Sequence, residues 1–326
     1  MSVTASSPAK IILFGEHFVV YGEPALVTAI DKRAYASAEL RSDERIYVSS
    51  ADLGISGYFL NEIFQAEYGG PKARVKLEPI RIAVQRILNL AKKEEGVNVK
   101  VHSSIPVAAG LGSSAAVAAA AAGSVGQLLG VKVSQDDIFQ AALEAERFVH
   151  GTPSGIDPAI ATYGGVLLYY KGKGHTCLKV EGDLPLVVGN TGMERSTGEM
   201  VAQVRKIRER HPSIFNPLIK AGGKIVLCAM EALKRGDLNT LGELMNINHA
   251  MLSAVGVSNE ALDRLVHAAR KAGALGAKLT GAGGGGCMIA LSHPEKLGRI
   301  VEEIEREGGK AFVARKTNLG VNIERS

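Results

Sequence analysis

The segment PVAAGLGSSAA at 106–116 has the residue types of a phosphate-binding loop. Gly110 and Gly112 carry no side chain that would keep a ligand away from the backbone, and Ser113 and Ser114 follow where a long alanine-rich helix is expected to begin. Unpaired N–H groups and the positive dipole end make a helix start attractive to an anion. The two hydroxyls can bind a phosphate or its metal ion.

The same segment fits other structures besides a phosphate loop. The spacing Gly110-x-Gly112-x-x-Ala115 also fits a dinucleotide-binding fingerprint. However, Pro106 and three further residues precede these glycines, and the acidic residue expected about 20 positions later lacks a strand to occupy. A Walker A loop is excluded because no Lys follows the second glycine. A serine-capped buried helix without a ligand remains the alternative.

A second glycine-rich segment, KLTGAGGGGC at 278–287, has five glycines in the six positions 281–286. An apolar strand is predicted directly after it. Such a backbone can line a phosphate pocket that side chains would obstruct, and a strained hairpin is the alternative.

Two acidic residues bracket a turn in the segment EAERFVHGTPSGID. Glu146 lies about one turn before the helix end that Gly151 predicts, where the negative dipole end disfavours a carboxylate. A bound divalent ion or the neighbouring Arg147 would compensate for this placement. Asp157 follows a tight Pro-Ser-Gly turn that can aim it away from its own backbone, although it could equally be an ordinary turn residue.

The N-terminal block PAKIILFGEHFVVYG places Lys10 at the start of an apolar strand and Glu16 and His17 just after it. Polar residues at strand ends often line sites. His17 taken alone is more typical of a structural residue than of a catalytic one.

The elements that must position these residues follow from apolar periodicity and turn signals. Strands are predicted at 10–14, 34–40, 46–49, 97–103, 166–170, 186–189, 287–291 and 311–315. Helices are predicted at 80–92, 113–129, 134–150, 199–210, 218–234, 237–252 and 260–272, with one more opened by a Ser292-x-x-Glu295 capping pattern. Strands separated by helices without strict βαβ regularity indicate an α+β protein of two domains, divided at 1–175 and 176–326.

Composition narrows the class of protein. The 326 residues suggest about two domains, and 46% apolar with 22% charged residues excludes a disordered chain. The net charge is +5, but Trp is absent and aromatics are 5%, so we expect anionic small substrates and no nucleic acid. Three scattered cysteines argue against a disulfide framework or structural zinc and fit a reducing, cytoplasmic setting. The uncharged run 103–131 could span a bilayer, but its Gly, Ser and Ala content favours a buried helix and no membrane.

Together these segments resemble the GHMP kinase superfamily and, within it, the mevalonate kinase family. The Ser-Ser glycine loop is shared across the superfamily, whereas GEHFVVYG and HGTPSGID favour the mevalonate kinase branch. One departure is Ala9, where many members have glycine. The resemblance implies an N-terminal domain like domain 2 of ribosomal protein S5, with a left-handed βαβ crossover, and a ferredoxin-like C-terminal domain. It also implies a homodimer.

The resemblance further implies ATP-dependent phosphorylation of the primary hydroxyl of mevalonate, with Mg²⁺ as cofactor. Asp157 would be the catalytic carboxylate and Lys10 its cationic partner, while Ser114 and Glu146 would bind Mg²⁺. Mevalonate would contact Lys10, Glu16, His17, Asp157, Ser196 and Thr197. ATP would contact Pro106, Ala108, Ala109, Gly110, Leu111, Gly112, Ser113, Ser114, Ala115, Ala116, Thr280, Gly281 and Gly283.

This assignment agrees with phosphoryl-transfer chemistry, which depends on positioning and charge neutralisation. Three alternatives remain at this point: a sister kinase acting on another acid of the same pathway or on homoserine, a nucleotide-binding sensor without turnover, and a Rossmann oxidoreductase. A sensor would be expected to lose charged groups that this chain retains, namely Lys10, Glu146 and Asp157.

Overall fold

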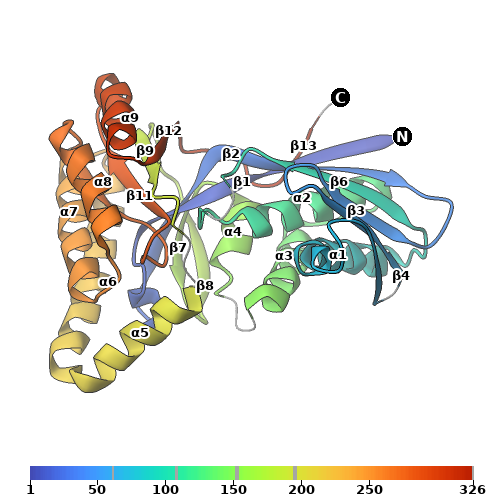
Figure 1. Cartoon of the computed structure of the whole chain (residues 1–326), viewed down its shortest axis with the longest axis horizontal. Helices are drawn as coiled ribbons and strands as arrows, with labels where there is room; N and C mark the ends of the chain where they lie inside the picture. The colour runs from blue at the N-terminus through green and yellow to red at the C-terminus, as the bar shows by residue number, and fades with distance from the viewer. Residues whose placement is uncertain (61, 107–108, 151–153, 194–196, 325–326) are drawn as a thin grey trace.

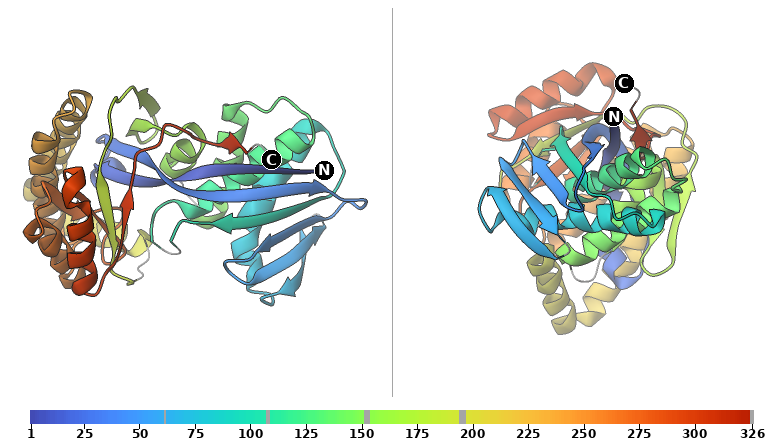
Figure 2. Two further views of the ribbon diagram at one scale, coloured as in Figure 1. Left: turned by 90° about the horizontal axis from the view of Figure 1, so that it is seen from above. Right: turned by 90° about the vertical axis from the view of Figure 1, so that its right-hand side faces the viewer.

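The computed structural model describes residues 1–60, 62–106, 109–150, 154–193 and 197–324. The molecule is elongated, with a first half of sheet and packed helices and a second half rich in helices (Figure 1). Two long strands, β1 (Ser2–Phe14) and β2 (Ala25–Leu40), run from one half toward the other (Figure 2, left). They carry residues from the start of the chain to the region where the halves meet.

The sheet of the first half is mostly antiparallel. Its main path runs β13-β1-β2-β6-β3-β4-β5, and β7 extends it from β2 to β8. The further strands are β3 (Ile46–Ser50), β4 (Ile55–Leu60), β5 (Ile63–Tyr68), β6 (Val97–Ser103), β7 (Val166–Tyr170), β8 (Gly174–Leu178) and β13 (Asn322–Ile323). Strands β3 and β6 pair in parallel through a connection containing β4, β5 and a helix. The handedness expected for the family's crossover stays a prediction.

A buried helix organises the first half. Helix α2 (Ser113–Leu128) packs on β1 and β2 and is flanked by α1 (Ala73–Ala91), α3 (Gln135–His150) and α4 (Ile156–Tyr163). Its alanines, from Ala115 to Ala122, are nearly all inaccessible to solvent. Small side chains let neighbouring backbones approach, so the uncharged run is the core helix that the sequence predicts.

The second half has a ferredoxin-like arrangement. Its elements follow the order β9 (Leu186–Asn190), four helices, β10 (Gly276–Leu279), β11 (Cys287–Leu291), α9 (Leu297–Arg306) and β12 (Lys310–Ala314), and its antiparallel sheet runs β10-β11-β9-β12. The four helices are α5 (Thr197–Arg210), α6 (Pro212–Lys234), α7 (Leu238–Ala254) and α8 (Glu260–Lys271). They extend to the end of the molecule away from the termini (Figure 2, left). The predicted α+β class with a ferredoxin-like second half is therefore confirmed.

The chain returns to its beginning. Residues Ala5 and Ser6 of β1 pair with Ile323 and Asn322 of β13, so the two termini lie side by side (Figures 1 and 2). The predicted division at 175 falls within β8, which pairs with β7 in the first sheet. The domain limits stay a prediction.

One sequence prediction about a helix start is wrong. The capping pattern at Ser292 does not open a helix: a short 3-10 turn (Pro294–Lys296) comes first, and α9 begins only at Leu297. Ser292 is fully buried, and its hydroxyl has no hydrogen-bond partner among the described residues. The following His293-Pro294 pair explains the delay, because a residue before proline is biased toward extended backbone.

Among the described helices, α6 is the one long and apolar enough to cross a membrane by length and composition alone. It packs on α7 and on the 3-10 turn η1 (Phe18–Tyr21). A Cβ added at Gly222 would meet the Phe18 ring at 2.3 Å, so this helix lies tightly against its neighbour. One face of α6 therefore packs closely against the rest of the protein, and 39% of its apolar window is buried.

Candidate active site

Lys10 and Asp157 form an ion pair where the two halves meet. The Lys10 ammonium lies 3.2 Å from Asp157 Oδ1, and the lysine side chain is 8% exposed. A shift in register between β1 and β2 at Pro8/Ala9 directly precedes Lys10. The two extra residues, Asp31 and Lys32, lie in β2, so the bulge bends β2 beside Lys10. The Lys10 backbone N–H also donates to the Leu111 carbonyl at 2.9 Å, which joins β1 to the first glycine loop.

Gly112 allows this pair to form beside the loop. Its φ is +76°, and a Cβ there would lie 2.9 Å from Lys10 Cγ and 3.5 Å from Asp157 Oδ2. An alanine would therefore be strained in backbone conformation and crowded by the lysine stem. The glycine is needed for close approach as well as for a left-handed turn.

The start of α2 has the features of an anion site. Its N-cap is Gly112, which has no side chain to bond the first N–H groups, and Ser113 and Ser114 are already helical. The interpretation of these serines as caps is therefore wrong. Ser114 is exposed in the first turn, so its hydroxyl is available to a ligand. The first-turn N–H groups remain oriented toward an incoming anion.

Asp157 also lies at a helix start, which the sequence analysis missed. Helix α4 begins after Gly155, whose φ is +80°, and Asp157 is in its first turn. A carboxylate is favoured there because the dipole end is positive. The turn before α4 therefore both orients the Asp157 side chain and starts a helix whose dipole stabilises the charge of Asp157.

Glu146 on α3 is the second carboxylate at this place. Its Oε2 accepts a hydrogen bond from the Gly155 N–H at 3.3 Å. Burial and the negative charge of Asp157 raise the pKa of Glu146 to about 8, against the opposing effects of the Gly155 N–H and Lys10. One ammonium thus lies near two carboxyl groups, and a further cation would stabilise the charged form of Glu146.

The residues present fit a magnesium ion. Mg²⁺ takes oxygen ligands, commonly one or two carboxylates completed by water and phosphate oxygens. The raised pKa of Glu146 is the observation that supports the fit, since a divalent ion would stabilise its charged form. Within the described ranges, no three His, Cys, Asp or Glu side chains form a metal cage, which the predicted Ser114 and Glu146 set does not require.

The second glycine loop faces the first. Gly286 lies opposite the phosphate loop, since a Cβ on it would come within 4.0 Å of the Ala109 carbonyl. Gly110 and Gly281, with φ of +71° and +85°, have open space where a Cβ would be. Gly283 is instead pressed against the Val257 carbonyl, which a Cβ would approach to 2.1 Å. The second loop therefore packs against Val257 at Gly283, while its backbone at Gly281 stays accessible.

Glu16 and Lys278 form a fully buried ion pair that joins the end of β1 to β10. Both side chains are inaccessible to solvent, and the Lys278 ammonium donates to Glu16 Oε1 and, at 2.7 Å, to the Leu279 carbonyl. Burial raises the pKa of Glu16 and lowers that of Lys278, while the charge of each partner opposes both shifts. The predicted contact of Glu16 with substrate stays a prediction; in the structure its carboxylate points to Lys278.

His17 and Thr280 add two more connections between the same segments. His17 Nε2 lies 2.8 Å from the Ala282 carbonyl, so the ring donates a proton there. The Thr280 hydroxyl donates to the Ile12 carbonyl at 2.8 Å. His17 has a φ of +60°, an uncommon conformation for a non-glycine residue. Burial lowers the pKa of His17, so its ring is neutral at neutral pH.

The remaining predicted residues divide into three groups. Ala108 and Ser196 lie outside the described residues. Ala115 and Ala116 are buried in the core, so only their backbone could face a nucleotide. Leu111 is buried, with its carbonyl bonded to the Lys10 N–H, while Pro106 is half-buried and Thr197 is exposed as the first residue of α5. Lys278 stands shortly before the glycine run, and no sequence pattern marks it as the partner of Glu16.

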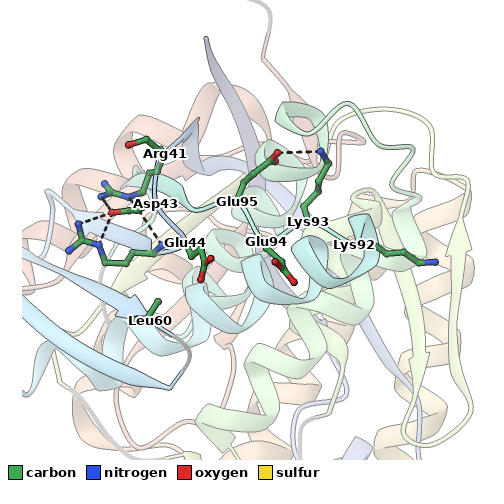
Figure 3. Close-up of a pocket in the computed structure, with 10 residues that line it drawn as sticks. Arg41, Asp43, Glu44, Leu60, Lys92, Lys93, Glu94 and Glu95 are labelled. Atoms are coloured by element: carbon green, nitrogen blue, oxygen red, sulfur yellow. Dashed lines mark hydrogen bonds and ion pairs between the residues drawn. The ribbon is translucent and has the colours of Figure 1, made fainter.

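A separate hollow of about 820 Å³ lies between the β2–β3 turn and the end of α1 (Figure 3). Its lining is charged and includes Arg41, Asp43, Lys93 and Glu95. None of the predicted site residues lines it. We therefore place the candidate active site at the glycine loops.

The fold and the paired loops define a two-domain small-molecule kinase. The family model described as GHMP kinases N terminal domain matches residues 79–165, and the one described as GHMP kinases C terminal matches residues 229–311. Curated mevalonate kinases of Thermococcus sibiricus and Pyrococcus furiosus are each 45% identical to this chain, with 99% of both sequences covered. The chain belongs to the mevalonate kinase family of the GHMP kinases.

Solved structures support the same relationship. The L. major mevalonate kinase in complex with R-mevalonate has a TM-score of 0.83 at 29% identity, covering 97% of this chain and 96% of that one. The Methanococcus jannaschii mevalonate kinase has a TM-score of 0.82 at 28% identity, covering 97% and 98%. A Lactococcus lactis galactokinase, at 23% identity and a TM-score of 0.80, shares the fold.

We predict that Lys278→Met destabilises the protein by about 3–5 kcal/mol, because it leaves the Glu16 charge buried and unpaired. The double variant Glu16→Gln/Lys278→Met should recover much of this loss. Urea unfolding midpoints measure both, with Lys271→Met as the control because the Lys271 side chain is 70% exposed. Equal midpoints for Lys278→Met and the control would contradict the prediction.

Proposed function

We propose that this chain transfers the γ-phosphoryl group of ATP to the primary hydroxyl of mevalonate, giving 5-phosphomevalonate for isoprenoid synthesis. The observation that carries the proposal is the Lys10–Asp157 pair beside two facing glycine loops. Similarity to mevalonate kinases over 99% of the chain supports the choice of alcohol.

The nucleotide phosphates would lie between the 106–116 loop and the 280–286 loop. Backbone N–H groups at the start of α2 would face their negative charge, and the glycines leave the backbone accessible. Fixed donors in a partly enclosed site stabilise developing charge without reorganising during the reaction. Binding and orientation of the phosphates are thus assigned to backbone groups.

Asp157 would act on the substrate alcohol. As the alcohol oxygen bonds to the γ-phosphorus, its proton passes to the Asp157 carboxylate and the bond to the ADP oxygen breaks. Lys10, whose ammonium lies 3.2 Å from Asp157 Oδ1, would hold the carboxylate in place and offset negative charge on the moving phosphoryl group. Mevalonate would also contact Glu16, His17, Ser196 and Thr197.

Ser114 and Glu146 would hold the Mg²⁺ ion. When bound, this ion neutralises phosphate charge and orients the phosphoryl group for in-line transfer. The Gly155 N–H keeps one Glu146 oxygen engaged, which leaves the other for the metal. A homodimer and a cytoplasmic location complete the proposal.

The direct test is incubation with ATP and a panel of alcohols: mevalonate, 5-phosphomevalonate and homoserine. ADP release should be selective for mevalonate, and NMR of the product should place the phosphate on the primary hydroxyl. Preferred turnover of another alcohol would assign the chain to a sister kinase. Nucleotide binding without phosphorylation of any alcohol would indicate a sensor.

Asp157→Asn should retain ATP and mevalonate binding while turnover falls by about 10²–10⁴-fold, because the proton acceptor is lost. Single-turnover rates and calorimetric binding separate these effects. Asp183→Asn, in an exposed loop, serves as the control. Near-native turnover of Asp157→Asn with normal binding would rule out the base role.

Glu146→Gln should raise the Mg²⁺ concentration needed for half-maximal turnover by about tenfold or more, since a charged ligand becomes a neutral amide. Glu144→Gln is the matched control: it lies two residues earlier on α3 and pairs with Arg86 instead. An Mg²⁺ titration on each variant gives the answer. Superimposable titrations would exclude Glu146 as a metal ligand.

A further inference from the structure

Tyr169 is a buried tyrosine whose ring and hydroxyl have different surroundings. It lies in β7, opposite Ala25 of β2, and is 6% exposed. Its ring belongs to an apolar cluster that includes Ile156 and Ile160 of α4. Its hydroxyl donates a hydrogen bond to the Ser154 carbonyl, directly before the N-cap of α4. The ring therefore supports the helix while the hydroxyl holds the turn that starts it.

That turn controls both carboxylates of the candidate site. The next residue, Gly155, donates its N–H to Glu146 Oε2 at 3.3 Å and is the N-cap of α4. Two residues later, Asp157 pairs with Lys10. A shift of the 154–155 backbone would displace the donor to Glu146 and the start of the helix that carries Asp157.

The turn has little else to fix it among the described contacts. Gly155 has a φ of +80° and provides no side-chain cap, and a Cβ on it would lie 3.9 Å from the Tyr169 hydroxyl. Ser154 is exposed, and among the described residues its hydroxyl accepts from the Ile156 N–H at 3.3 Å. The Tyr169 hydroxyl is thus the contact from the sheet that reaches this turn.

We propose that Tyr169 is a positioning residue, whose hydroxyl holds the 154–155 turn so that Gly155 keeps Glu146 aimed at the metal. The part about the metal rests on the proposed function of Glu146. Tyr169 touches neither substrate nor reacting atoms in this scheme. Burial and the nearby Glu146 charge raise the pKa of Tyr169, so the hydroxyl keeps the proton that it donates.

The test is Tyr169→Phe, which removes the hydroxyl and keeps the ring. The adjacent Tyr170→Phe is a matched control, because Tyr170 points to the other face of β7, where Lys173 lies 5.9 Å from its ring. In Tyr169→Phe, the Mg²⁺ concentration that gives half-maximal tight ADP binding should rise about 3- to 10-fold. This change corresponds to the loss of one hydrogen bond. Calorimetry should show metal-free ADP binding unchanged, and Tyr170→Phe should match the native protein.

A second readout needs no metal. Hydrogen exchange at the Gly155 amide should be faster in Tyr169→Phe, because the turn that aligns it with Glu146 is released. In a Glu146→Gln background, adding Tyr169→Phe should produce no further shift in the Mg²⁺ midpoint, since both changes act through one ligand.

The outcomes separate the two proposals. If Glu146→Gln alone leaves the Mg²⁺ midpoint unchanged, the metal assignment fails, and faster Gly155 exchange in Tyr169→Phe still supports positioning of the turn. Unchanged Gly155 exchange overturns the positioning role. A lower melting temperature without any change in Gly155 exchange or Mg²⁺ midpoint also overturns it, because the hydroxyl would then contribute only to stability.

Discussion

The contact between Lys10 and Asp157 over Gly112 is the constraint on which the site depends. Lys10 comes from β1, Gly112 from the start of α2 and Asp157 from the start of α4, so three segments remote in sequence must meet within 4 Å. The long β1 strand, the alanine-rich packing of α2 and the short α4 all serve this meeting. A single ammonium then faces two carboxyl groups, and a bound cation would stabilise the charged form of Glu146 that burial and Asp157 disfavour.

A second ion pair, Glu16–Lys278, is fully buried and helps to position the 280–286 glycine loop. Removing Glu16 and Lys278 from water is expensive, and their attraction repays that cost only with good geometry. The pair therefore contributes more to selecting one arrangement of these segments than to the net stability of the fold. Together with the His17–Ala282 hydrogen bond, it ties the end of β1 to the loop, and β1 also carries Lys10. Strand β1 therefore positions both the 280–286 loop and the Lys10 ammonium relative to each other.

The features of this site that could be predicted from the sequence are those that depend on a short stretch of neighbouring residues. Glycine runs, the serines after Gly112 and the uncharged helix are local signals, and the structure places them as expected except for the role of the serines. Strands β4 and β5 and helix α4 were missed, because such short elements depend more on packing against other elements than on a local sequence pattern. The Glu16–Lys278 pair and the Tyr169 contact were also beyond prediction, since each joins residues whose proximity arises only from the tertiary fold.

Two helices that begin without side-chain caps connect the local chemistry to the whole fold. A capping side chain on α2 or α4 would satisfy the first N–H groups, and having glycine there instead lowers the stability of the helix by only a few tenths of a kcal/mol. Both helices have glycine at that position, at φ values near those of left-handed turns. Without capping side chains, the first N–H groups and the positive dipole ends of both helices remain directed toward the place where Lys10 lies. Preorganised positive potential of this kind acts on phosphate charge without rearrangement, so the missing caps are a property of the site and not a defect of the helices.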